Sequence, residues 1–301
     1  MQLQHNLICT WFLSLLVLSV PASATEKEPG GFVDIVTREY TIEGPKSLGL
    51  GWHNFRFRNQ GGQAHFVSIY KMSEGKDLED QLAEVAPVFD PLMNGLRSGE
   101  LTKADIGPFL QEHLPPWGLQ MGHVGGPGLM APGKTSHTAI RFDEPGIYLM
   151  ECYVKGPDGN WHTMMGMLKQ LEITGNRSAG IEPQATSKVA VSNSGIEAPG
   201  TLTAGKQTFR IDFLEAPPGP FPFDVHIARL EEDTDMDRVV HWMDWTNVGG
   251  LRAPAPVEFL GGMEHMQAGR HGYVTVDLDP GQYLWISRTN AARMQARFTV
   301  K

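Results

Sequence analysis

One short loop of the sequence gathers side chains that bind soft metal ions. It starts with the thiol of Cys152 and carries the imidazole of His162 and the thioethers of Met164, Met165 and Met167. Thiolate, imidazole and thioether ligands favour copper, whereas calcium, magnesium and manganese prefer oxygen ligands. The loop is therefore a candidate copper site.

Strand-like segments flank this loop on both sides. Residues 145–150 predict a turn that leads into a strand, and residues 168–174 alternate apolar and polar side chains as a half-buried strand does. We expect the loop at one end of a β-structure, with Cys152 where the first strand ends and Met167 where the next strand begins.

A second candidate imidazole, His65, opens a strand-like segment directly after a glycine-containing turn. Taken one at a time, these residues have plainer explanations. His65 could hydrogen-bond a neighbouring loop, His162 could lie at the surface, and the methionines could fill the core. Together with Cys152, however, the set favours a metal site over any of these separate roles.

Residues 1–24 are typical of an export signal, with an apolar run from Leu7 to Val20 and the small residues 22–24 before a polar segment. They contain no Lys or Arg, so a membrane anchor is the alternative. Cleavage would remove Cys9 and leave Cys152 as the single thiol of a periplasmic or secreted protein. Such a thiol is either buried and inert or a protected ligand.

The chain is acidic, with a formal net charge of −9 that belongs wholly to the part after the signal. This charge argues against nucleic acid and against anionic membrane surfaces as partners. No later segment is long and apolar enough to span a bilayer, so no membrane span is expected after signal cleavage.

The distribution of glycine, proline and short strand-like runs predicts an all-β protein of two β-sandwiches. The first domain is expected over residues 31–176, with a helical insertion at about 74–116 whose apolar residues have helical spacing. Residues 177–196 are polar and rich in Ser, Gly and Pro, which predicts a linker. The second domain is expected over residues 197–301.

The second domain repeats the plan of the first. Residues 145–149 recur as 280–284 in a shared Pro-Gly-x-Tyr-Leu pattern, and the glycine pair 125–126 recurs as 261–262. The repeat places three residues opposite candidate ligands: His226 opposite His65, Ser287 opposite Cys152 and Met294 opposite Met167. Because the second loop lacks both Cys and His, we expect one metal-binding domain and one structural domain.

On the turn that begins at Asn59 and on His65, Cys152, His162 and Met167, the sequence resembles the cupredoxin family of blue copper proteins. The resemblance implies two Greek-key cupredoxin-like β-sandwiches in tandem. It also implies one copper ion in the first domain, held by His65, Cys152 and His162, with Met167 as a weak axial ligand. Met164 and Met165 are the alternatives for the axial position.

Three functions are consistent with these residues. The first is mononuclear copper electron transfer with a redox protein as partner. The second is copper delivery or sequestration through a copper-exchange partner, since thioethers favour Cu(I). The third is a metal-free module that binds a partner protein through its acidic surface and helical insertion.

An enzyme is not expected. The sequence has no His-x-His pair of the kind that builds the trinuclear cluster of multicopper oxidases, and no clear set of histidines for a nitrite-reductase-like centre. No catalytic signature surrounds Cys152, so a cysteine protease is not expected either.

Overall fold

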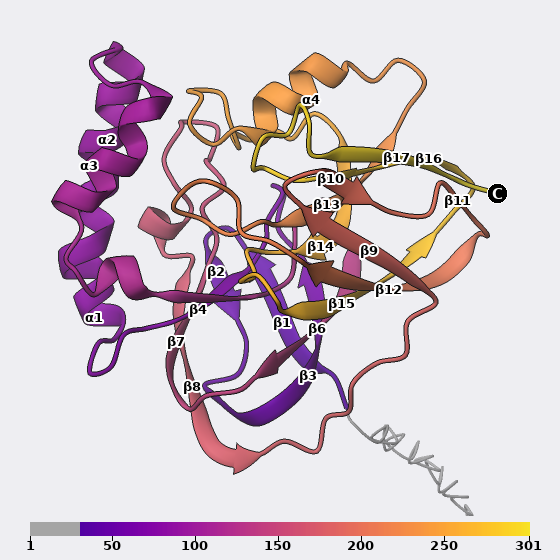
Figure 1. Ribbon diagram of the computed structural model, residues 1–301, viewed down its shortest axis with the longest axis horizontal. Coiled ribbons are helices and arrows are strands. Elements are labelled where there is room, and N and C mark those ends of the chain that lie inside the picture. The colour runs from indigo at the N-terminus through magenta and orange to yellow at the C-terminus, as the bar shows by residue number, and fades with distance from the viewer. Residues whose placement is uncertain (1–30) are drawn as a thin grey trace, which may run out of the picture.

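The computed structural model describes residues 31–301, so the expected signal peptide at residues 1–24, with Cys9, lies outside the described residues. The protein is built mainly of β-strands, which form two β-sandwiches in tandem, with helices inserted in the first (Figure 1). The predicted all-β fold with a helical insertion is therefore confirmed. Within the described part of the chain, no helix has the length and apolar character that crossing a bilayer requires.

Eight strands form the first sandwich. They are β1 (Val33–Arg38), β2 (Thr41–Glu43), β3 (Ser47–Asn59), β4 (Ser68–Lys71), β5 (Gly122–Gly125), β6 (Thr135–Phe142), β7 (Gly146–Glu151) and β8 (Leu168–Arg177). The long strand β3 pairs with β6 through its second half and with β8 through its first, and so connects the two layers of this sandwich.

Nine strands form the second sandwich. They are β9 (Ser187–Ser192), β10 (Gly195–Glu197), β11 (Thr201–Leu202), β12 (Gly205–Phe213), β13 (Val225–Leu230), β14 (Glu258–Met263), β15 (His271–Leu278), β16 (Gly281–Ile286) and β17 (Gln295–Val300). A short helix, α4 (Met236–Met243), follows β13.

The two sandwiches use the same strand pairing. β1 runs parallel to β3 as β9 does to β12, and β3 is antiparallel to β6 as β12 is to β15. The remaining strands pair in the order β8-β7-β4-β5 in the first half and β17-β16-β13-β14 in the second. The internal repeat seen in the sequence is thus a repeat of topology.

Equivalent positions of the two halves meet at their junction. β6 pairs with β15 so that Thr138 lies opposite Val274, and the repeat that equates Gly125 with Gly261 equates these two residues as well. Backbone bonds cross the junction in both directions: Gly128 N to Gly262 O at 3.0 Å and Glu264 N to Gly126 O at 2.9 Å. The halves are therefore related by a local two-fold axis at this seam, and one hydrophobic cluster spans both.

The helical insertion lies between β4 and β5 and runs along one side of the first sandwich (Figure 1). It comprises α1 (Leu78–Asp80), the π-helix η1 (Gln81–Val85), α2 (Ala86–Ser98), the 3-10 turn η2 (Lys103–Asp105) and α3 (Ile106–His113). The Asp77 carboxylate caps the first turn, and Gly99 ends α2 in the left-handed conformation. Leu92, Ile106 and Leu110 form the buried contact between its helices.

The structure differs from the expected linker at residues 177–196, because β9 and β10 lie within it. Val189 and Val191, with Ala190 between them, are fully buried where β9 pairs with β12, and polar residues flank the three. Three of the six residues of β9 are polar, so the segment was predicted to be a linker. A strand buried on one face needs an apolar residue only at every second position. The connection between the sandwiches is residues 178–186.

The repeated glycines make a testable contribution to the fold. Gly126 has φ +131°, and a Cβ added there would lie 2.0 Å from the Val67 carbonyl oxygen. We expect Gly126→Ala to lower the free energy of unfolding by about 3 kcal/mol or more, through backbone strain and overpacking together. Urea denaturation measures the loss. Gly133→Ala is the control, because Gly133 has φ +73° but no atom within 4 Å of the added Cβ, so about 1 kcal/mol is expected. Equal losses would contradict the steric argument.

Candidate metal centre

The three predicted ligands, far apart in the sequence, converge at one end of the first sandwich. Cys152 follows the last residue of β7, and its Sγ lies 3.8 Å from Nδ1 of His65 and 3.7 Å from Nδ1 of His162. The two Nδ1 atoms are 3.2 Å apart. All three side chains are fully buried.

These separations suit a metal ion in the plane of the three donors. With metal–nitrogen bonds of about 2.0 Å and metal–sulfur bonds of about 2.3 Å, a trigonal site places its nitrogens roughly 3.5 Å apart and nitrogen and sulfur roughly 3.7 Å apart. The distances here agree to within a few tenths of an ångström. The group of His65, Cys152 and His162 could therefore hold a metal ion, and two imidazoles with one thiolate form the trigonal set of blue copper sites.

Local backbone hydrogen bonds fix each ligand. His65 was expected to open a strand, but it lies three residues before β4. It forms an isolated bridge with Met130 in which both backbone amides donate. The His162 amide donates to the Val154 carbonyl at 2.8 Å, which folds the loop back towards Cys152. Each ligand is therefore held by its main chain as well as by packing.

Polar side chains behind the imidazoles set which ring nitrogen faces the centre. His65 Nε2 lies 3.1 Å from Glu39 Oε1, and His162 Nε2 lies 3.1 Å from Gln63 Oε1. Oxygen acceptors at Nε2 keep the proton there and leave the Nδ1 lone pair directed at the centre. The backbone N–H of Gln63 donates to Glu39 Oε1 at 2.7 Å and connects the two supports.

Burial governs the charge state of the ligands. It lowers the pKa of His162 to about 3 and also lowers that of His65, so both imidazoles are neutral at pH 7. Burial raises the pKa of Cys152 to about 12, against the hydrogen bonds from the backbone amides of Phe66 and Val154 to its sulfur. A bound cation would have to displace the thiol proton, and those two amides would then stabilise the thiolate.

The methionines of the loop differ in burial. Met167 is fully buried directly before β8, with its amide donating to the His162 carbonyl and its carbonyl accepting from the Cys152 amide. Met164, in the 3-10 turn η4 (Thr163–Met165), is 47% exposed. Burial favours Met167 for the axial position, which stays a prediction.

The second sandwich contains a counterpart of the centre without its chemistry. The Ser287 amide donates to the Met294 carbonyl at 3.0 Å, as the Cys152 amide does to the Met167 carbonyl at 3.1 Å. His226 is fully buried, but its Nδ1 accepts from the Leu129 amide at 3.1 Å and so has no lone pair free for an ion.

A buried arginine supplies the positive charge in this counterpart. The Arg288 guanidinium pairs with the carboxylates of Asp224 and Glu264, and Asp224 also accepts from Ser287 Oγ at 2.7 Å. Asp224, Glu264 and His265 are near enough to one another to hold a metal ion. The Arg288 guanidinium already pairs with both acids, so the cluster is an internal ion network.

Several of these polar residues were not identified from the sequence. Glu39 lies in a turn without a motif, and Gln63 is at an unspecified position of the turn that begins at Asn59, so the sequence offers no signal for either. His265 has no spacing signal in the sequence, and its position beside Asp224 follows only from the folding of the second sandwich. One feature of the sequence is consistent with this buried polar cluster: Asp224 lies two residues before His226, the counterpart of His65.

The support behind His162 can be tested by substitution. Gln63→Leu removes the oxygen acceptor at Nε2 while keeping a side chain of similar size, and we expect metal affinity to fall about ten- to a hundredfold. Competition against a chelator measures this affinity. Gln60→Leu is the control, since Gln60 lies in the same turn but is exposed. An equal loss in the control would mean that the turn, and not the hydrogen bond, is responsible.

The buried ion network predicts a specific pH dependence of stability. Burial raises the pKa of Glu264 from 4.5 to about 8, with Arg288 opposing the shift. The folded protein thus keeps a proton that the unfolded chain releases above pH 4.5, so this group's contribution to stability falls as pH rises from about 4.5 to 8. We expect Glu264→Gln to remove that contribution.

Urea denaturation of wild type and Glu264→Gln at pH 5 and pH 8 measures the difference. The exposed Glu74 provides the matched control, Glu74→Gln, which should keep the wild-type pH dependence. A pH dependence that is unchanged in Glu264→Gln would show that this carboxyl is not the group responsible.

No protein-family model matches the sequence, and no curated protein matches it. Among solved structures, auracyanin A, a blue copper protein from Chloroflexus aurantiacus, is 17% identical with a TM-score of 0.28, over 48% of this chain and 98% of its own. A multicopper oxidase is 12% identical with a TM-score of 0.26, over 91% of each chain. A copper-containing nitrite reductase from Thermus scotoductus is 11% identical with a TM-score of 0.22, over 90% of this chain and 61% of its own.

All three TM-scores are below 0.3, so these similarities say nothing about function. The strand pairing of this chain and the position of its ligands at one end of the first sandwich define the fold. On that basis the chain consists of two cupredoxin-like β-sandwiches in tandem.

Proposed function

We propose that this protein carries one copper ion in its first domain and transfers single electrons. His65, Cys152 and His162 would hold the ion, and Met167 would be the weak axial ligand. The observation that supports this best is the buried triangle of two imidazole nitrogens and one sulfur, with separations of 3.2, 3.7 and 3.8 Å. Such a set accommodates copper in both of its common oxidation states.

When bound, copper supplies a reversible one-electron couple. The residues of the chain would keep the site rigid while the charge of the copper ion changes. Glu39 and Gln63 hold the imidazoles in one orientation, and the amides of Phe66 and Val154 donate to the sulfur. Full burial of the ligands excludes water from the donor atoms, so little rearrangement would accompany electron transfer.

We favour electron transfer over catalysis because the structure offers no second group of metal ligands that is free of other charged partners in residues 31–301. In residues 31–301, the other group of potential metal ligands is Asp224, Glu264 and His265, and Arg288 compensates its charge. A second redox metal would therefore have to be bound elsewhere. The partner we propose is a redox protein, or a copper-exchange protein, in the periplasm or outside the cell.

Copper delivery is the second candidate, and one observation favours it. The half-exposed thioether of Met164 stands two residues from His162 and lines the same cavity as Met121. Accessible thioethers beside a buried site could pass Cu(I) inwards or outwards, because sulfur ligands select that ion.

The copper proposal predicts a spectrum that depends on one thiolate. Protein loaded with Cu(II) should show an intense thiolate-to-copper absorption in the red, and Cys152→Ser should abolish it. Met167→Leu should keep the colour and raise the reduction potential, because the axial ligand tunes that potential. Met164→Leu, at the exposed position, is the control and should leave the potential unchanged.

Three results would argue against these roles. Colour that survives in Cys152→Ser would exclude Cys152 as the ligand. An unchanged potential in Met167→Leu would reject the axial assignment. If Met164→Leu slows Cu(I) transfer to a chelator while the potential stays the same, delivery is favoured over electron transfer.

A further inference from the structure

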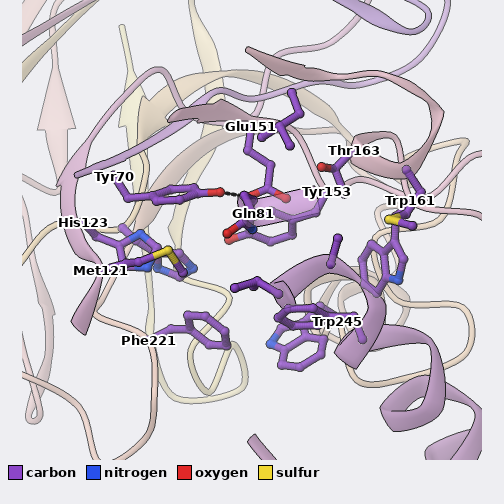
Figure 2. Close-up of a pocket in the computed structure, with 16 residues that line it drawn as sticks. Tyr70, Gln81, Met121, His123, Glu151, Tyr153, Trp161, Thr163, Phe221 and Trp245 are labelled. Atoms are coloured by element: carbon purple, nitrogen blue, oxygen red, sulfur yellow. Dashed lines mark hydrogen bonds between the residues drawn. The ribbon is translucent and has the colours of Figure 1, made fainter. Parts of the chain in front are cut away.

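A cavity of about 100 Å³ lies beside the metal centre, where the helical insertion, the first sandwich and the second half of the chain meet (Figure 2). Four lining residues are sequence neighbours of a proposed ligand: Glu151 and Tyr153 beside Cys152, and Trp161 and Thr163 beside His162. Its wall reaches the surface at Met164, which is 47% exposed.

Aromatic rings form a large part of the wall. Six of the lining residues are aromatic: Tyr70, Phe89, Tyr153, Trp161, Phe221 and Trp245. They come from all three parts of the chain, so the aromatic surface exists only in the assembled fold. Flat apolar faces of this kind favour another planar ring, which stacks on them face to face or edge to face.

A few buried polar atoms interrupt this apolar surface. Gln81 and Trp161 are 5% and 6% exposed, and Gln81 Oε1 and Trp161 Nε1 have no hydrogen-bond partner within the described protein. One is an acceptor and the other a donor. A buried polar atom without a partner costs about 1–3 kcal/mol, and a single hydroxyl group can both donate and accept. Gln81 also opens the π-helix η1, a type of segment that recurs at functional sites.

The wall of the cavity disfavours an ionic ligand. Glu151 accepts from the Tyr70 hydroxyl at 2.8 Å, and the lining residues include no Lys or Arg to balance an anion. Towards the second sandwich, burial and then the positive charge of Arg288 lower the pKa of His123 to about 4. Burial in this apolar wall would likewise cost a cationic ligand its hydration. The cavity therefore suits a neutral molecule.

We propose that this cavity binds a neutral phenol with a single aromatic ring. The ring would lie between the aromatic walls, and its hydroxyl would donate to the unpartnered Oε1 of Gln81. At about 100 Å³, the cavity is smaller than the roughly 150 Å³ cavity known to hold benzene in another protein, so the ligand can have no more than one ring. This site is distinct from the metal ligands, and its occupation does not require copper.

Isothermal titration of the full-length metal-free protein with phenol tests the proposal. We expect saturable binding of one phenol per chain, with weaker binding of benzene, benzoate and benzylammonium. Gln81→Leu removes the acceptor at similar volume and should weaken phenol binding about tenfold, the value of one hydrogen bond. Ala86→Trp should fill the cavity and abolish binding, since Ala86 lines it.

Matched controls lie on the same insertion. Ala83 and Gln111 are exposed, and Ala83→Trp and Gln111→Leu should bind phenol like the wild type. Absence of saturable phenol binding to the wild type, or wild-type binding by Gln81→Leu, would overturn the proposal. Tighter binding of benzylammonium than of phenol would reject the neutral class.

A second readout uses the copper-loaded protein and rests on the proposed function. Phenol should shift the thiolate-to-copper absorption, because the cavity is lined by residues on both sides of Cys152. Calorimetric binding without a spectral shift would place the phenol away from these residues and overturn the assignment to this cavity. Because the calorimetry needs no metal, a protein that fails to take up copper still gives a clear result for the phenol site.

Discussion

The register between β4 and β7 is the constraint on which the metal centre depends. Ser68 pairs with Glu151, so the chain three residues before Ser68 and one residue after Glu151 comes together at the same end of the sheet. A slip of one residue would turn alternate side chains to the opposite face. Packing on both faces resists such a slip, because Ile69 and Met150 belong to the main core whereas Leu149 packs in a separate cluster on the other face. Packing in the core therefore fixes where the imidazole of His65 meets the sulfur of Cys152.

The second sandwich shows how the same backbone frame persists without a metal ion. The hydrogen bond from position 287 to position 294 matches that from 152 to 167, yet a serine replaces the cysteine. Here Arg288 provides the central positive charge, with Asp224 and Glu264 in place of soft ligands. A buried ion network of this kind needs every charge compensated, since an unpaired charge in the interior is strongly destabilising. One topology thus supports either a candidate metal site or a set of ion pairs.

The two halves also depend on each other near the centre. The Arg288 guanidinium lies over the rings of Phe66 and Tyr153, at 4.5 and 5.0 Å from their centroids. These two residues directly follow the proposed ligands His65 and Cys152 in the chain. The buried Lys155 crosses in the other direction and donates to the carbonyl oxygens of Trp245 and Asn247 at 2.9 and 3.0 Å. The loop that carries the proposed ligands is therefore held from both sides.

The sequence by itself determined the ligand types, the all-β class, the helical insertion and the repeat, because these depend on local spacing and on side-chain chemistry. Cys152 and His162 belong to one loop, so their shared metal-binding chemistry could be predicted without knowledge of the fold. The sequence could not show β9, because polar residues flank its few apolar ones. It also could not show the supports Glu39 and Gln63, which contact the imidazoles only in the folded protein. The Arg288 network and the aromatic cavity were decided by tertiary structure alone. The network joins segments of the second sandwich that lie far apart in the sequence, and the cavity joins residues of both sandwiches and the insertion. Only close packing determines which buried charges pair and which polar atoms stay unpartnered.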